Sequence, residues 1–220
     1  GLNEDRMLDL FFYMAVCSII GARLFYIINE VGLPYFDDPL MIFKIWEGGL
    51  VFQGGVIGAI IFGVTYTIRT KMPTFLVGDV FMPAVAIGHA IGRMGCFFAG
   101  CCYGRPAPEG FPFALTFPAD AFSVAPAGIA LYPTQIAEAL GELLIFGFLI
   151  WYRKRKKFDG AVMLMYIMVY SVLRSVLEIF RGDEVRGYFI EPYISNGQFI
   201  SIVAIIVSMF LWVYLKKKEA

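Results

Sequence analysis

The chain has 220 residues, a length typical of about one domain. Hydrophobic residues make up 59% of it and charged residues only 16%, whereas an average soluble domain is about 25% charged. One core of this size cannot bury so much apolar surface, so the composition excludes an ordinary water-soluble protein. The 18 basic and 18 acidic residues balance to a net charge of zero, which argues against general nucleic-acid binding.

The apolar residues form six segments, each close to the ~20 residues with which a helix crosses a bilayer. These segments cover about residues 8–28, 50–68, 75–98, 133–152, 161–180 and 198–215. Pro83 and several glycines interrupt the third segment, which weakens its helical pattern. The sequence therefore predicts an all-α, polytopic integral membrane protein with about six transmembrane helices.

Basic residues in the links between these segments orient the predicted helices. The 153–157 run is RKRKK, three lysines stand at 216–218, and the 69–74 link contains Arg69 and Lys71. Because Lys and Arg concentrate in cytoplasmic loops, we expect both ends of this chain to face the cytoplasm. The links at 29–49, 105–132 and 181–197 then lie on the outer side. The basic run is interpreted as an anchor for topology and anionic lipid.

Charged and amide side chains inside or at the ends of the predicted helices are candidate functional residues. A charge there costs roughly 2.5–3.5 kcal/mol on insertion scales, so it usually faces a partner or a polar cavity. The candidates are Arg23, Gln53, Asp79, His89, Arg93, Gln135, Glu138, Glu142, Arg174, Glu178 and Gln198. Arg174 and Glu178 are four residues apart and can simply pair on one helix face. Arg93 has no carboxylate three or four residues away, so it needs an anion from elsewhere.

Glycines cluster around two of these candidates, Gln53 and Arg93. The segment 48–58 reads GGLVFQGGVIG, and 88–104 reads GHAIGRMGCFFAGCCYG. Such glycines either let helices pack closely or let the backbone approach a ligand headgroup. Arginine is well suited to phosphate, so Arg93 and Arg174 on different helices predict a phospholipid-headgroup site within the bilayer. Neither the Walker pattern nor the dinucleotide fingerprint occurs, which disfavours a soluble nucleotide.

The four cysteines, Cys17, Cys96, Cys101 and Cys102, are too few and too clustered for a disulfide scaffold. Cys101 and Cys102 are adjacent, and the C-x-x-C spacing of structural zinc sites is absent. We therefore expect neither a metal nor a cofactor. Small apolar packing is the favoured interpretation of Cys101 and Cys102. Covalent lipid carriage or redox activity is the alternative.

Six ordered motifs resemble those of the bacterial prolipoprotein diacylglyceryl transferases. They are GARLFYII (21–28), GGLVFQGGVIG (48–58), GHAIGRMGCFFAGCCYGR (88–105), LYPTQIAEAL (131–140), YSVLRSVLEIFRGD (170–183) and SNGQFIS (195–201). The resemblance implies a multi-pass enzyme of the bacterial inner membrane. Such an enzyme transfers the diacylglyceryl group of phosphatidylglycerol to the thiol of a lipobox cysteine in a preprolipoprotein. It also implies one domain over 1–220 that lacks the family's usual first helix.

The resemblance assigns roles to individual residues. Arg93 corresponds to the arginine thought to bind the phosphate, and Arg174 to the other essential arginine. Gln53 replaces a histidine of the family pattern, so we expect His89, the single histidine, to take over part of its role as a base. The expected catalytic set is therefore Gln53, His89, Arg93 and Arg174. The expected substrate-binding set is Gly92, Gly95, Cys96, Cys101, Gly104, Gln135, Glu138, Glu178 and Arg181.

Two of these positions depart from the family signature, because Cys96 stands at an asparagine and Cys101 at a glutamate. Phospholipid binding is therefore better supported than the identity of the acceptor. Two alternatives stay open. One is a divergent transferase that uses phospholipid with a different acceptor. The other is a phospholipid-binding membrane protein without catalysis.

Overall fold

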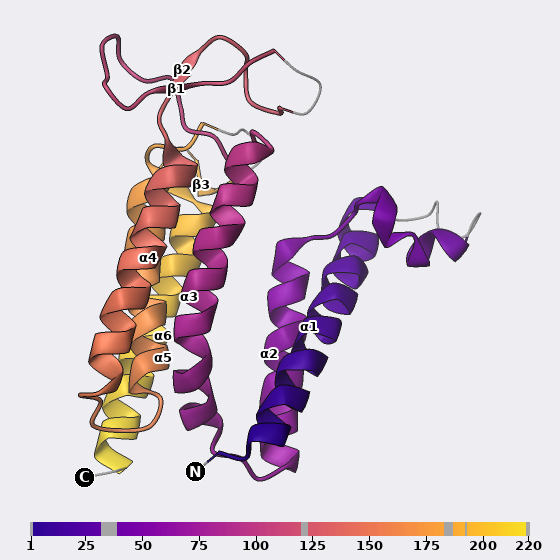
Figure 1. Ribbon diagram of the computed structural model, residues 1–220, viewed down its shortest axis with the longest axis vertical. Helices are drawn as coiled ribbons and strands as arrows, with labels where there is room; N and C mark the ends of the chain where they lie inside the picture. Colours follow the sequence, from indigo (N-terminus) through magenta and orange to yellow (C-terminus); the bar gives the residue numbers. More distant parts are fainter. Residues whose placement is uncertain (1, 32–38, 120–122, 183–186, 192, 219–220) are drawn as a thin grey trace. The chain divides into compact units, whose positions relative to one another are not determined.

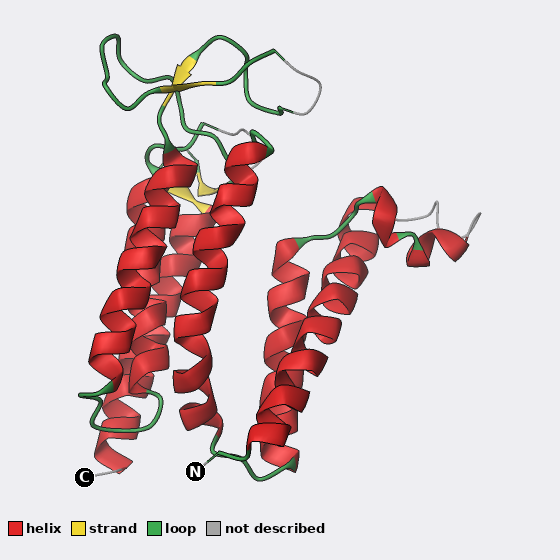
Figure 2. Cartoon of the chain, viewed as in Figure 1, coloured by secondary structure: helices red, strands yellow, loops and turns green. Residues whose placement is uncertain are grey.

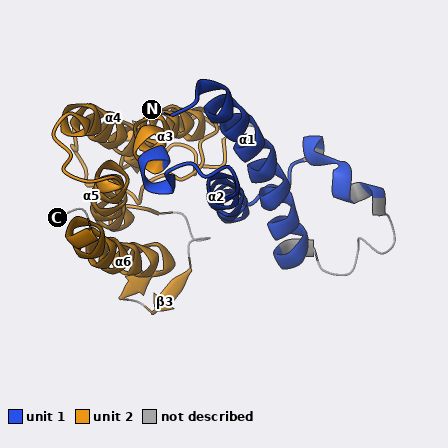
Figure 3. Ribbon diagram, turned by 90° about the horizontal axis from the view of Figure 1, so that it is seen from below, with its two compact units in different colours: residues 1–77 blue, residues 78–220 orange. Residues whose placement is uncertain are grey.

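The computed structural model describes residues 2–31, 39–119, 123–182, 187–191 and 193–218 (Figures 1 and 2). Asp183, the last residue of one family motif, lies outside these residues. The chain divides into two compact units, Gly1–Val77 and Gly78–Ala220 (Figure 3). The sequence-based expectation of one domain over 1–220 stays a prediction.

The first unit is a hairpin of two helices. Helix α1 (Glu4–Tyr26) begins at Asn3, whose side chain accepts a hydrogen bond from the Arg6 amide, and continues as a π-helical turn over Ile27–Val31. Two short 3₁₀ helices, Pro39–Phe43 and Ile45–Glu47, lead to α2 (Phe52–Arg69). The two long helices run in opposite directions (Figure 1).

Glycines bring α1 and α2 into backbone contact. A Cβ atom added to Gly21 would strike the carbonyl of Gly54, and one added to Gly58 would strike the carbonyl of Cys17. Small residues at such positions allow close packing of helices in lipid. The glycines around Gln53 thus serve helix packing, which is one of the two functions expected from the sequence.

Arg23 joins the connection to α1. Its guanidinium donates hydrogen bonds to the backbone carbonyls of Ile42 (3.1 Å), Gly48 (2.7 Å) and Gly49 (3.0 Å). The side chain is buried, and these carbonyls satisfy much of its hydrogen-bonding capacity. Arg23 therefore has a structural explanation within the first unit.

The second unit is a bundle of helices with two small sheets. Its helices are α3 (Thr74–Phe98, most of which lies in this unit), α4 (Thr134–Arg153), α5 (Ala161–Glu178) and α6 (Asn196–Lys218). Strand β1 (Leu115–Thr116) pairs with β2 (Ala130–Leu131), and β3 (Tyr188–Ile190) pairs with β4 (Ile194–Ser195), both antiparallel. Figure 2 shows the helices side by side with both sheets at one end of the bundle.

The predicted helical segments match the observed helices to within a few residues. Five helices of the described chain are long and apolar enough to cross a membrane: Glu4–Asn29, Thr74–Phe98, Thr134–Arg153, Ala161–Glu178 and Asn196–Lys218. The polytopic all-α prediction is confirmed. Helix α2 forms where a sixth span is predicted, but it is not among these five. Pro83 lies inside α3 without ending it.

Two kinds of packing distinguish the inside of the bundle from its outside. Ala86, Leu149, Val162 and Tyr166 are buried together where α3, α4 and α5 meet. Large apolar side chains elsewhere, such as Leu144 and Phe210, remain more than two-thirds exposed. An exposed apolar surface of this extent is typical of helices that face lipid.

A buried aspartate fixes the start of α5. Both carboxylate oxygens of Asp79, on α3, accept hydrogen bonds from backbone amides, Oδ2 from Gly160 and Oδ1 from Met163, each at 2.9 Å. The ammonium of Lys156 also lies 2.9 Å from Oδ2. A carboxylate at a helix N-terminus is stabilised by free amide groups and by the helix dipole. Asp79, a candidate on the basis of sequence, is thus explained by architecture.

Candidate active site in the helix bundle

The central polar group of the second unit joins α3 to α4. Arg93 Nη2 lies 2.9 Å from Glu138 Oε1, and Arg93 Nε donates a hydrogen bond to His89 Nε2 at 3.3 Å. His89 Nδ1 lies 2.7 Å from Glu142 Oε1. Because Nε2 accepts a hydrogen bond from Arg93, the ring proton is placed on Nδ1 and is donated to Glu142. His89 is therefore held between an arginine and a carboxylate.

Sequence spacing explains why these side chains meet. His89 and Arg93 are four residues apart on α3, and Glu138 and Glu142 are four residues apart on α4. Residues at this spacing lie one turn apart on the same helix face, so two facing helices present two pairs to one another. Both glutamates are at least 96% buried, and a carboxylate in such a place requires a partner.

Two tyrosines of α5 extend the group. The Tyr170 ring lies 5.1 Å from the His89 ring in an edge-on arrangement, and it stacks on Tyr166. The Tyr166 hydroxyl donates a long hydrogen bond of 3.5 Å to Glu142 Oε1. Tyr170 is close enough to interact electrostatically with both Arg93 and Arg174, the two arginines expected from the sequence.

The second arginine lies near the end of α5. Arg174 Nη2 is 2.7 Å from Glu178 Oε2, and Arg181 Nε is 4.0 Å from the same oxygen. The pairing of Arg174 with Glu178 considered from the sequence is therefore present. Arg174 Nη1 is nevertheless buried and has no hydrogen-bond partner among the described residues. One face of this guanidinium therefore still has hydrogen-bonding capacity for an anion.

The loop after α3 is held by the first turn of α4. Gln135 Nε2 donates to the carbonyl of Cys101 at 2.9 Å, and Thr134 Oγ1 donates to the carbonyl of Cys102 at 3.0 Å. Further along, Gly104 and Arg181 form an isolated antiparallel bridge. A Cβ atom on Gly104 would strike the carbonyl of Tyr132, so only glycine fits there. These contacts tie the loop to the ends of both α4 and α5.

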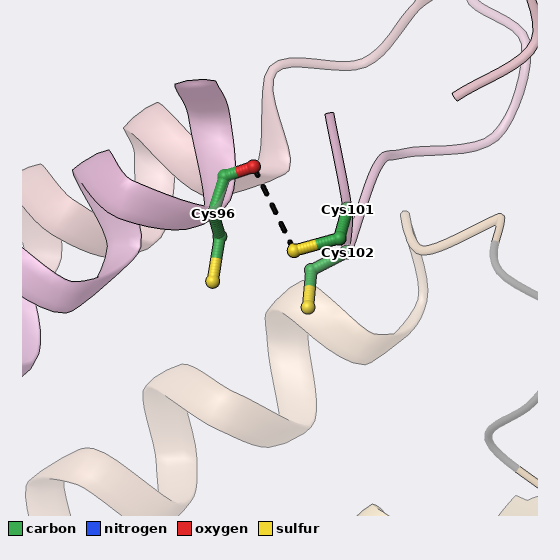
Figure 4. Close-up of side chains that lie close together, drawn as sticks. All are labelled: Cys96, Cys101 and Cys102. Atoms are coloured by element: carbon green, nitrogen blue, oxygen red, sulfur yellow. Dashed lines mark hydrogen bonds between the residues drawn. The ribbon is translucent and has the colours of Figure 1, made fainter. Parts of the chain in front are cut away.

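Three cysteine thiols gather at this loop. The Sγ atoms of Cys96, Cys101 and Cys102 all lie within 4.8 Å of one another (Figure 4). The Cys101 thiol donates a 3.7 Å hydrogen bond to the carbonyl of Cys96. Burial raises the pKa of the Cys101 thiol, which favours its protonated form at neutral pH.

A family model described as prolipoprotein diacylglyceryl transferase matches residues 1–214. The chain belongs to this family. It is 34% identical over 212 residues to phosphatidylglycerol–prolipoprotein diacylglyceryl transferase 2 of Clostridium perfringens, a match that covers 96% of this chain and 80% of that protein. It is equally identical over 212 residues to the transferase of Clostridium tetani, covering 96% and 82%.

A third relative comes from a more distant bacterium. The phosphatidylglycerol–prolipoprotein diacylglyceryl transferase of Acinetobacter baumannii strain SDF is 30% identical over 222 residues, covering 100% of this chain and 80% of that protein. These comparisons confirm the resemblance drawn from the motifs. The protein is a multi-pass membrane member of a family of transferase enzymes.

Within this diacylglyceryl transferase family member, the structure brings together many of the residues expected to act. His89, Arg93 and Glu138 form one group, Arg174, Glu178 and Arg181 another, and Gln135 contacts Cys101. A Cβ atom on Gly92 or Gly95 would meet no atom within 4 Å, so no neighbour in this unit packs on that face of α3. Gln53 is exposed in the first turn of α2, in the first unit. The role of each in substrate binding or catalysis stays a prediction.

The sequence-based sets omitted several members of the site. Glu142 was a candidate charge without an assigned role, and Thr134, Tyr166 and Tyr170 were not considered. Tyr166, Tyr170, Arg174 and Glu178 recur every four residues along α5. That periodicity, applied to polar residues, would have identified the two tyrosines as facing the same side as Arg174.

Proposed function

We propose that the protein transfers the diacylglyceryl group of phosphatidylglycerol to the thiol of a lipobox cysteine in a prolipoprotein. The observation that carries the proposal is the buried group of His89, Arg93 and Glu138 in a chain of this family. The relatives are named for phosphatidylglycerol and prolipoprotein, which supports both substrates here.

The two arginines are the proposed binding site for the phosphate. Arg93 and Arg174 both interact electrostatically with Tyr170, so a headgroup placed at this tyrosine is within reach of both guanidiniums. Nη1 of Arg174 supplies a donor that no described residue uses. The carboxylates of Glu138 and Glu178 keep the guanidiniums in place before substrate arrives. A planar arginine fork binds phosphate oxygens in pairs, which a lysine cannot do.

The proposed reaction is one substitution at carbon. The cysteine sulfur, as thiolate, attacks the glyceryl carbon bonded to the phosphate oxygen, the carbon–oxygen bond breaks, and its electron pair leaves with glycerol phosphate. Negative charge grows on the phosphate, so positive groups at Arg93 and Arg174 stabilise the transition state. The thiol proton must go to a base, and His89 Nε2 is the proposed acceptor because Glu142 holds the other ring nitrogen as a donor. Arg93 Nε, which donates to this Nε2 in the structure, turns to the phosphate oxygens in the proposed reaction and leaves Nε2 able to take the proton.

We place this reaction at the bacterial cytoplasmic membrane, with both ends of the chain in the cytoplasm. The basic residues at 153–157 and 216–218 support this orientation. Both small sheets lie in the links 105–132 and 181–197, which are expected to face the outer side, and Cys101 and Cys102 lie just before the first of these links. A prolipoprotein presents its lipobox on this side. Phospholipid enters laterally from the bilayer in this arrangement.

The test is a transfer assay with the full-length protein. It is reconstituted in phosphatidylglycerol vesicles with a lipobox peptide, and the peptide mass is measured. We expect a gain of one diacylglyceryl group, abolished in Arg93→Ala and preserved in Arg155→Ala. Arg155 is a matched control because it lies in the loop after α4, where its guanidinium stacks on Trp151 of that helix. It takes no part in the group formed by His89, Arg93 and Glu138.

One set of residues favours a second function, which is diacylglyceryl transfer to a different acceptor. Gln53, Cys96 and Cys101 replace polar residues of the family signature. Cys96 lies near the end of α3, and Cys101 lies in the loop that follows. Lipid retained by the protein without any peptide product would support this second function. Equal lipid retention by the wild type and by Arg93→Ala would contradict a phosphate site at Arg93 under either function.

A further inference from the structure

The three cysteines form a soft donor set that the proposed mechanism does not use. Their Sγ atoms lie within 4.8 Å of one another, and sulfur atoms that share a zinc ion at Zn–S distances of about 2.3 Å are about 3.8 Å apart. Modest rotations of the side chains therefore suffice to bring all three onto one ion. Figure 4 shows the three sulfurs in one group beside the end of α3.

The loop that presents these thiols is constrained at both of its cysteines. The carbonyls of Cys101 and Cys102 are held by Gln135 and Thr134 from α4. Cys102 also adopts a left-handed backbone with φ of 57°, a conformation that favours glycine or asparagine over other residues. A strained residue that carries a reactive side chain is a recognised sign of function. Cys102 Sγ lies within 4.8 Å of both other sulfurs.

The charges of the three thiolates and of Arg93 are compatible with a bound cation. Three thiolates and one Zn²⁺ leave a net charge of about −1. Arg93 lies one helical turn before Cys96, and its guanidinium interacts electrostatically with both Cys96 and Cys102. The excess negative charge is therefore next to a buried arginine. The absent C-x-x-C spacing does not oppose the site, because the turn after α3 brings the sulfurs together instead.

We propose that Cys96, Cys101 and Cys102 bind one Zn²⁺ ion and leave its fourth position for the thiol of the acceptor. Zinc sites with four protein ligands are closed, whereas three-ligand sites keep a position for water or substrate. Zinc holds a coordinated thiol as thiolate, which is the nucleophilic form. Two of the positions at which this chain departs from the family signature, Cys96 and Cys101, thereby acquire a shared role.

The role of the fourth position rests on the proposed transfer reaction. The acceptor thiol binds Zn²⁺ and releases its proton, with His89 as the receiving base. Its sulfur then forms a bond to the glyceryl carbon while the carbon–oxygen bond breaks toward the phosphate. No oxidant or reductant is consumed. The product is a neutral thioether, a weaker zinc ligand than thiolate, which favours its release.

The test uses Co²⁺ as a spectroscopic probe for Zn²⁺ in the full-length protein, purified under reducing conditions. We expect thiolate-to-cobalt charge-transfer absorption with saturation at one ion per chain, and displacement of the ion by Zn²⁺. Single Cys96→Ser and Cys102→Ser variants are expected to lose most of this absorption. Cys17→Ser is the matched control, because Cys17 lies on α1 in the first unit and is expected to leave the spectrum unchanged.

A lipobox peptide then tests the fourth position. The cysteine peptide is expected to change the visible cobalt bands, whereas the same peptide with serine is not. Absence of the charge-transfer band, or its survival in a variant with serine at all three positions, overturns the site. A band that does not respond to the cysteine peptide overturns the acceptor role.

The transfer assay separates this inference from the proposed function. Cobalt binding and a peptide response without any diacylglyceryl product would contradict the proposed function and support the site. Unreduced transfer by the triple serine variant, together with absent cobalt binding, would contradict the site and support the function. Monodisperse elution of each variant establishes that lost absorption does not reflect misfolding.

Discussion

Two buried charged groups in the same helix bundle differ in how completely their atoms are paired. Around Asp79, each carboxylate oxygen accepts a backbone amide hydrogen bond, and Lys156 adds an ion pair. Around His89, by contrast, Glu142 Oε2 has no hydrogen-bond partner among the described residues, and the same holds for Arg174 Nη1. A fully paired buried group stabilises a fold, whereas unused capacity costs stability and is retained where a ligand uses it.

The largest expected effect breaks the Asp79 group. Asp79→Ala removes a buried carboxylate. It leaves two amides at the start of α5 without their partner and leaves Lys156 with Asp159 in place of both carboxylates. Breaking a buried ion pair costs about 3–5 kcal/mol, so unfolding in mixed detergent micelles is expected at much lower denaturant. Transfer per folded molecule should be nearly unchanged. A variant that stays as stable as wild type but loses activity would reverse the interpretation of the two groups.

At Arg93 we expect the reverse, a large loss of transfer with little loss of stability. Arg93→Lys keeps a positive charge beside Glu138 but loses the planar fork and the hydrogen bond to His89. Transfer to the peptide should fall by about 100-fold or more, since loss of one preorganised charged donor typically costs 10²–10³ in rate. Initial rates at saturating phosphatidylglycerol measure this. Full activity in the lysine variant would show that Arg93 acts only as a point charge.

Variants of His89 and of its partner Glu142 compare a proposed base with the residue that orients it. His89→Gln is expected to lower transfer by about 100-fold, the lower range for loss of a general base. Glu142→Gln should have a smaller effect of about tenfold, because a ring-orienting partner acts indirectly. Equal rates for His89→Gln and wild type would assign the proton transfer to another group.

The smallest expected effect concerns pH and Lys156. Burial lowers the pKa of Lys156, but hydrogen bonds from its ammonium to Asp159 and Asp79 outweigh burial, so the pKa is raised above its usual value. The pairing therefore stabilises the fold fully below the unfolded-state pKa of about 10.4 and is lost as pH rises through the higher folded-state value. Thermal unfolding midpoints measured across pH 10–12 should decline, and Lys156→Met should decline less. Parallel curves would show that Lys156 is not linked to folding.

Helix positions followed from the sequence because apolar runs of bilayer length have few alternatives to a helix in lipid. Arg93 was identified because its charge lacked any local partner, and Glu138 and Gln135 came from the family motifs. The partners Glu142, Tyr166 and Thr134 depend on which faces of α3, α4 and α5 meet, which composition does not determine. The thiol group depends on a left-handed turn at Cys102 that no spacing rule anticipates. Asp79 and Arg23 show the converse, since conspicuous charges in spans turned out to serve architecture.

The glycines divide into two classes with different tolerance to a single methyl group. At Gly21 and Gly58 an added methyl would collide with backbone atoms of the paired helix, so alanine there would force α1 and α2 apart. At Gly92 and Gly95 the same methyl would meet no atom within 4 Å among the described residues of the second unit. Alanine at those two positions is therefore expected to change the stability of the fold very little. It is expected to lower transfer only where a lipid headgroup lies against that face of α3. Methyl substitution there would therefore map the path by which phospholipid is proposed to approach Arg93.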